Sequence, residues 1–161
     1  MSRDIDSLRE KLLRELGERD LPQTQEASNA DFKYLEDQAD EEFLKFGLDF
    51  AVSLAIQGNW VEARNTVKRY RGLNSANISA LIFEMRCLYE LESYTEVLAL
   101  GQSPVTEKHH LISANYLMAL SFEALEMYPQ ARSRYEAIMR QDPNFLDVSL
   151  RLSKLQGISG R

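Results

Sequence analysis

The side chains with the chemistry for catalysis or metal binding are few in this chain. His109 and His110 are adjacent, and imidazole nitrogens are good ligands for transition metals. Neighbouring residues at the start of a helix point in different directions, and no third ligand follows at a suitable spacing, so we expect no metal site. Cys87 is the only cysteine, which excludes an intrachain disulfide and a multi-cysteine metal site.

No catalytic pattern accompanies these residues. The sequence contains no glycine-rich phosphate loop, no nucleophile elbow, no metal-binding helix motif and no nucleophile beside a base. The acidic residues between 36 and 42 lack the glycine and the ligand spacing of a calcium loop, so we expect a solvated helix face. We therefore expect a protein that is not an enzyme and that needs no cofactor.

Charge also limits the choice of partner. The formal net charge is −6, and residues 1–44 hold 13 acidic against 6 basic residues. An acidic chain is a poor ligand for nucleic acid or for an anionic membrane, since both are bound by clustered Lys and Arg. The first residues lack the apolar core of a secretion signal, and no apolar run is long enough to cross a bilayer. We expect a cytoplasmic protein that binds no nucleic acid and does not insert into a membrane.

The elements that position these side chains follow a repeat of 34 residues. The stretch QGNWVEAR at 57–64 recurs as LESYTEVL at 91–98 and as LEMYPQAR at 125–132. Trp60, Tyr94 and Tyr128 share one position in the repeat, and the residues three places later are Ala63, Val97 and Ala131. A ligand site has no reason to recur at a fixed period, so we expect these aromatic residues to be structural.

Apolar residues recur at helical spacing on both sides of each such stretch, which predicts a helix, a tight turn and a second helix in every copy. Cys87 shares its position with Ser53 and Ser121, where small side chains pack, and we expect a buried, unreactive thiol. The basic residues of the second helices are expected to be solvated; they are Arg64, Lys68, Arg69, Arg71, Arg132, Arg134 and Arg140.

The 34-residue period and the turn sequence resemble the tetratricopeptide repeat. That resemblance implies an all-α solenoid of helix-turn-helix hairpins, with units at 44–77, 78–111 and 112–145 and a C-terminal capping helix at 146–156. Small residues at 51, 63, 119 and 131 are expected where the two helices of a hairpin come closest. The stretch DPNFLDVSLRLSKL is similar to the end of many bacterial members of this class.

The middle copy departs from the repeat pattern. Met85 and Val97 replace the usual small pair, and Glu84 occupies a position that is normally apolar. Gly101 and Pro104 are predicted to shorten its second helix to roughly two turns.

The first 43 residues form a separate acidic leader. Residues 1–30 are predicted to contain a short amphipathic helix and, from residue 17, a flexible linker. The apolar stripe of that helix consists of Ile5, Leu8, Leu12 and Leu16. Residues 31–43 are either a capping helix or an extension of the first repeat helix. We predict that the stripe docks in the groove of its own chain or of a second copy, which would make a homodimer through the N-terminal helix.

The resemblance also indicates a binding surface, because the first helices of such repeats line a concave groove. The matching groove positions are Lys45, Leu48, Val52, Ile82, Arg86, Tyr89, Tyr116, Leu120, Glu123, Leu150 and Lys154. Members that hold a peptide's terminal carboxylate use Lys, Asn and Arg, whereas the matching positions here are Leu48, Val52, Phe83, Arg86, Ser113 and Leu117.

This composition predicts an adaptor or scaffold that binds an apolar peptide or an amphipathic helix of another protein. Two alternatives remain open at this point. One is a small chaperone that shields an apolar segment of a secreted or membrane client, and the other is a structural subunit that only dimerises.

Overall fold

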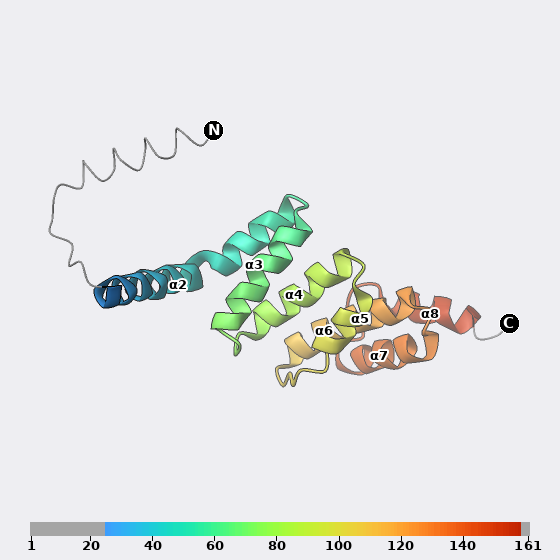
Figure 1. Cartoon of the computed structure of the whole chain (residues 1–161). Coiled ribbons are helices and arrows are strands. Elements are labelled where there is room, and N and C mark those ends of the chain that lie inside the picture. Colours follow the sequence, from blue (N-terminus) through green and yellow to red (C-terminus); the bar gives the residue numbers. More distant parts are fainter. Residues whose placement is uncertain (1–24, 159–161) are drawn as a thin grey trace, which may run out of the picture. The chain divides into compact units, whose positions relative to one another are not determined.

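The computed structural model describes the backbone of residues 25–158 and the side chains from residue 36 onward. This part of the chain is entirely helical (Figure 1). Its helices are α2 (Gln25–Ile56), α3 (Trp60–Leu73), α4 (Ile78–Glu90), α5 (Tyr94–Leu100), α6 (Lys108–Ala124), α7 (Tyr128–Gln141) and α8 (Val148–Ile158). None of them is both long enough and apolar enough to cross a membrane.

The chain divides into two compact units, Met1–Asp40 and Glu41–Arg161. The α2 helix is a single helix of 32 residues that begins at Gln25. Residues 25–30, which the sequence analysis placed at the end of the linker, belong to this helix. Residues 31–43 lie inside this helix. The predicted stripe of Ile5, Leu8, Leu12 and Leu16 lies outside the described residues.

The second unit is built from three helical hairpins whose turns are alike. The central turn residues Gly58, Glu92 and Glu126 have φ angles of 82°, 58° and 59°, in the left-handed region. The residue after each closes the turn through its amide, which donates to a carbonyl five residues back at 2.8–2.9 Å. Because the three turns are 34 residues apart, the middle copy keeps the register of the other two.

Small residues bring the paired helices together, as predicted. Ala51, Ala63, Ala119 and Ala131 are all 0% exposed. Trp60 is half-buried and packs against the first core cluster, beside Ala51 and Ala63. Methyl groups at these positions let two helix backbones approach closely, and the aromatic ring fills the wedge beside them. The turn aromatic is therefore a packing residue.

The second helix of the middle hairpin is short, as its glycine and proline predicted. The α5 helix ends at Leu100 after 7 residues, whereas α3 and α7 each have 14. Gly101 follows, and a Cβ atom built on it would lie only 2.7 Å from Met118 Cγ. The Met118 side chain would have to move to admit a side chain at this position. Residues 101–107 then lead to α6.

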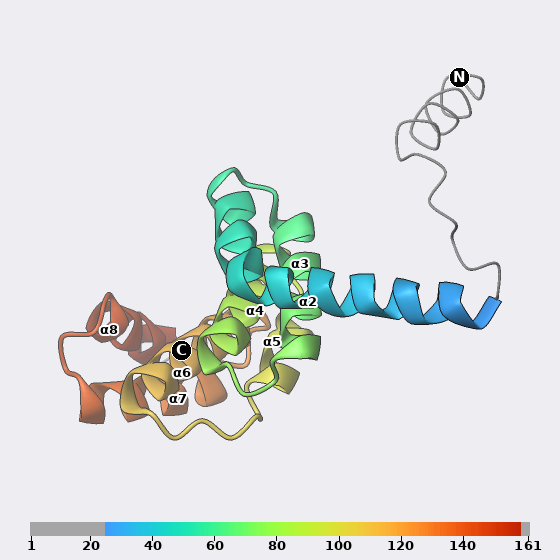
Figure 2. The same ribbon diagram turned by 90° about the vertical axis from the view of Figure 1, so that its left-hand side faces the viewer.

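The α8 helix closes the array. Val148 and Leu155 are 0% and 1% exposed and belong to the same core cluster as Tyr135 of α7. Figure 2 shows α6, α7 and α8 packed beside one another in the second unit. The helix begins at Val148, two residues later than the sequence predicted, after Leu146 with a φ of 44°.

The first hairpin leaves one apolar face exposed. Phe46 and Phe50 on α2 are 63% and 56% exposed. The position of Phe50 is occupied one repeat later by Glu84, which pairs with Arg71 of α3. Two repeats later it is occupied by Met118, which lies beside Gly101 after α5. This register position therefore faces the preceding second helix in the later hairpins. Among described residues 41–158 no second helix covers this position of α2, and Phe50 is exposed.

Candidate partner-binding groove

Residues of α4, α6 and α8 line a shallow pocket of ≈ 240 Å³. It is lined by Tyr89 of α4, by Leu120, Glu123 and Ala124 of α6, and by Arg151 of α8. Tyr89, Leu120 and Glu123 are predicted groove residues, so the structure brings three of them together. Arg151 was not predicted.

Arg151 organises the charges beside this pocket. Its Nη1 donates to Glu123 Oε2 at 3.0 Å, and its Nε donates to Asp147 Oδ2 at 2.8 Å. Two tyrosine hydroxyls complete the network. Tyr135 donates to Glu123 Oε2 at 2.7 Å, and Tyr116 donates to Asp147 Oδ1 at 2.7 Å. Each carboxylate thus accepts from one arginine nitrogen and one phenol.

The network favours fixed protonation states. Burial raises the pKa of Tyr135, and its hydrogen bond to Glu123 raises it further, so the phenol remains a donor. Burial and the hydrogen bond to Asp147 raise the pKa of Tyr116 in the same way. Burial alone would raise the pKa of Asp147, but the Tyr116 hydrogen bond and the Arg151 charge outweigh it and lower the pKa. The carboxylate therefore stays ionised beside Arg151.

The other predicted groove residues differ in exposure. Leu120 is 6% exposed and contributes little surface to the pocket, whereas Val52 and Leu150 are 37% and 55% exposed. Leu48, Ile82, Tyr89, Tyr116 and Glu123 are half-buried, and Lys45, Arg86 and Lys154 are exposed. Lys45 Nζ pairs with Glu42 at 2.8 Å, and Arg86 pairs with Glu90 one turn later. Both exposed cations on α2 and α4 thus have a carboxylate partner.

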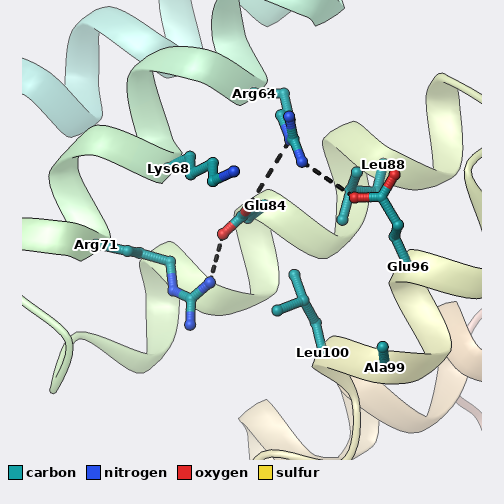
Figure 3. A pocket seen from close by; sticks show the side chains of 8 residues that line it. All are labelled: Arg64, Lys68, Arg71, Glu84, Leu88, Glu96, Ala99 and Leu100. Carbon is teal, nitrogen blue, oxygen red and sulfur yellow. Dashed lines mark hydrogen bonds and ion pairs between the residues drawn. The ribbon is translucent and has the colours of Figure 1, made fainter.

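A second pocket of ≈ 270 Å³ lies between α3, α4 and α5 (Figure 3). Glu84 is 3% exposed at its edge. Arg71 Nη1 pairs with Glu84, and Arg64 Nε lies 3.9 Å from it while Arg64 Nη2 donates to Glu96 at 3.0 Å. The prediction that Arg64 and Arg71 are merely solvated is therefore wrong, because they neutralise a buried carboxylate.

The two histidines also lie differently from the prediction. Their ring centroids are 3.9 Å apart, and both rings face the carboxylate of Glu107. Although they are adjacent in sequence, both rings turn toward Glu107, the N-cap residue of α6, so the prediction that they point in different directions is wrong. Cys87 agrees with its prediction, since it is a free, buried thiol whose pKa is raised to about 11 by burial.

No protein-family model matches the chain, and no curated protein is similar to it in sequence. Solved structures do match. The first tetratricopeptide-repeat domain of human RPAP3 superposes with a TM-score of 0.64 at 15% identity, covering 71% of this chain and 91% of that domain. The second RPAP3 domain, in complex with the HSP70 peptide SGPTIEEVD, gives 0.64 at 14% identity, covering 73% and 98%.

This chain has a tetratricopeptide-repeat fold. The MamA RS-1 ArsTM double mutant is a further similar structure, with a TM-score of 0.64, 16% identity and 82% of each chain covered. The all-helical hairpin architecture predicted from the sequence is therefore confirmed. At identities of 14–16% the similarity shows the fold alone and does not identify a binding partner.

Arg151 is the residue that the sequence analysis missed. A signal for it was present, because Asp147 precedes it by four residues, the spacing of an ion pair on one helix face. Its link to Glu123 joins α8 to α6 across 28 residues, and no local pattern shows such a contact. Part of the polar lining of this pocket is thus supplied by α8.

Proposed function

We propose that this chain is a protein-binding module whose concave face holds an apolar segment of another protein. The observation that supports it is the closed network around Arg151. Glu123 and Asp147 each accept hydrogen bonds from Arg151 and from a tyrosine, so these carboxylate oxygens already have partners within the protein. The apolar groups that the pocket offers a ligand are the ring of Tyr89 and the methyl group of Ala124, with a small part of Leu120 beside them.

An anionic peptide end suits this surface poorly. The second RPAP3 domain is in complex with an acidic HSP70 peptide, SGPTIEEVD. In the present chain, Arg86 is the one cation among the positions that match a carboxylate clamp, and it is paired with Glu90. Two carboxylates beside the pocket would repel a further negative charge. We therefore infer that the ligand is an apolar extended segment or the apolar face of an amphipathic helix.

Exposed apolar side chains extend this surface along the first helices. Val52 on α2 and Leu150 on α8 are exposed, and both belong to the predicted groove positions. The resulting binding mode is a helix or strand laid across several hairpins, in which buried apolar area supplies most of the affinity.

Two exposed alanines allow a matched test. Ala124 lines the groove and Ala99 lies on α5 outside it. Ala124→Glu places a charge in the apolar part of the groove, and Ala99→Glu places the same charge elsewhere. We expect the wild type and A99E to retain the same proteins from a native extract and A124E to lose them, with circular dichroism unchanged in all three. Equal capture by A124E and wild type would contradict the proposal.

The captured protein also distinguishes two uses of the groove. A client that aggregates when it is purified alone favours a chaperone, and a folded, independently active partner favours an adaptor.

Self-association is a second candidate, favoured by the exposed Phe46 and Phe50 of α2. Light scattering across a dilution series of wild type and of the double variant Phe46→Ser, Phe50→Ser tests it. A dimer that dissociates earlier in the variant supports the idea, and a monomer at every concentration rejects it.

A further inference from the structure

Three side chains at the start of α6 bring metal-binding atoms together. Glu107 Oε2 lies 3.1 Å from His110 Nδ1 and 3.6 Å from His109 Nε2. The three ligand atoms all lie within 4.8 Å of one another. Ligands at about 2.1 Å from a tetrahedral zinc ion are about 3.4 Å apart. The spacing therefore suits one ion with little rearrangement.

The surroundings of His110 support metal binding. Its Nε2 lies 3.1 Å from Ser79 Oγ, and its Nδ1 is buried without a hydrogen-bond partner of good geometry. If Nε2 carries the proton and donates to Ser79, the lone pair of Nδ1 faces a carboxylate oxygen. Two acceptors at this distance repel unless a cation lies between them. A second ring nitrogen that donates to a hydroxyl or carbonyl is the usual support of a metal-bound histidine.

The carboxylate is also free for this role. Glu107 is the N-cap residue of α6, yet its side chain makes no capping hydrogen bond. A helix N-terminus has partial positive charge and disfavours a cation, so a site here requires an anionic ligand. Glu107 supplies that charge and faces the two rings instead of the helix amides.

We propose that Glu107, His109 and His110 bind a first-row transition-metal dication, with zinc as the representative ion. Two imidazoles and one carboxylate suit this class, whereas magnesium and calcium prefer oxygen ligands alone. Three protein ligands leave the fourth position to water. Through Ser79 the site links the first turns of α4 and α6, at the side of the connection that follows the short α5.

The chain as it exists offers a direct test, because it contains 2 histidines. Zinc chloride titrated into the full-length protein should shift the imidazole nitrogen resonances of both histidines and saturate at one equivalent. Calorimetry should report the same stoichiometry, and the melting temperature should rise with zinc because the ion binds the folded state. Magnesium in excess should change neither the resonances nor the melting temperature.

Variants of the exposed ligands keep this test independent of folding. The side chains of Glu107 and His109 are 62% and 74% exposed, so Glu107→Gln and His109→Gln should not disturb packing. We expect each to weaken zinc binding at least about tenfold, and Ser79→Ala to weaken it about tenfold. The control Glu126→Gln removes an exposed carboxylate elsewhere and should bind zinc like wild type. Unshifted histidine resonances, or equal affinity in E107Q and H109Q, would overturn the proposal.

Discussion

The second and third hairpins share one turn and one register but differ in how their second helices are packed. The α7 helix has 14 residues and α5 has 7. Where the third hairpin buries Tyr135 completely, the second has Gly101 at the equivalent position. Where the third has the buried Met118, the second has Glu84 held by Arg71 and Arg64.

This difference shows which parts of the repeat set the fold. The turn is kept in both hairpins, and the residue pair between the two helices is fully buried in both, although Met85 and Val97 replace the two alanines in the second. The length of the second helix differs between the two hairpins, and so does the polarity of the first-helix residue at the position of Glu84 and Met118. A buried ion pair rarely stabilises more than apolar packing of the same volume, so we expect the second hairpin to be the weaker one.

Removing Tyr135 should give the largest effect. Its side chain is 0% exposed, and its hydroxyl donates to Glu123. Tyr135→Ala is expected to lower the free energy of unfolding by about 3 to 5 kcal/mol, the cost of deleting a large core aromatic. Urea denaturation measures it, with the half-buried Tyr128→Ala as the milder control. A loss no larger than that of the control would show that the third hairpin does not depend on this residue.

Breaking the ion pair of the second hairpin should cost less. Arg71→Ala leaves Glu84 buried with Arg64 at 3.9 Å, and we expect a loss of about 2 to 3 kcal/mol in unfolding free energy. Glu84→Met introduces the side chain type of the third hairpin and should stay within about 1 kcal/mol of wild type. If both variants lose the same amount in urea denaturation, the ion pair itself stabilises the hairpin.

Alanine substitutions at two glycines distinguish the effect of close packing from that of helix propensity. A Cβ at Gly101 would press on Met118, whereas a Cβ at Gly72 in α3 meets nothing within 4 Å. Gly101→Ala should destabilise by about 1 to 2 kcal/mol through overpacking. Gly72→Ala should stabilise by about 0.5 to 1 kcal/mol, because alanine is the better helix former. Thermal unfolding compares the two, and a neutral G101A would mean that Met118 moves aside freely.

The left-handed turn residues allow a finer comparison. Glu92 and Glu126 have the backbone conformation that Gly58 adopts in the first hairpin. Glu92→Gly and Glu126→Gly should each raise the unfolding free energy by up to about 1 kcal/mol, and Gly58→Ala should lower it by about 1 kcal/mol. Unequal gains at 92 and 126 would show that the two turns are strained to different degrees.

The smallest effect concerns pH and belongs to the third hairpin and α8. Because the folded-state pKa of Asp147 is lowered, its contribution to stability is present above its unfolded pKa of about 3.9 and is lost as pH falls through the folded value. Tyr116→Phe removes one hydrogen bond to Asp147. The variant should therefore lose less stability than wild type on acidification below about pH 4, as measured by urea denaturation. Parallel pH profiles would contradict this role of Asp147.

Local patterns account for most of the fold. The turn at 57–59, the small residues at 51 and 63, and the short helix before Gly101 are all determined by neighbours in sequence, and each was predicted. The start of α2 at Gln25 was not predicted, because the polar residues between 25 and 30 are compatible with either a helix or a linker.

The candidate sites were predictable only in part. Tyr89, Leu120 and Glu123 follow from the repeat register, which fixes one face of each first helix. Arg151 meets Glu123 only because α8 packs beside α6, and Arg71 meets Glu84 across a loop. The turn of both histidine rings toward Glu107 depends on side-chain rotamers, which sequence spacing does not fix.

The brevity of α5 bears on how the array comes apart. In a solenoid each helix packs only against its near neighbours, so folding cooperativity depends on the contacts between successive helices and not on one common core. The α5 helix has half the residues of α7, and since the first four amides of any helix have no partner within it, α5 has less than half as many internal hydrogen bonds to lose before it opens. If α5 frays, the first hairpin stays connected to α6–α8 only through the packing of α4 on α6, so the second hairpin is where local opening is expected first.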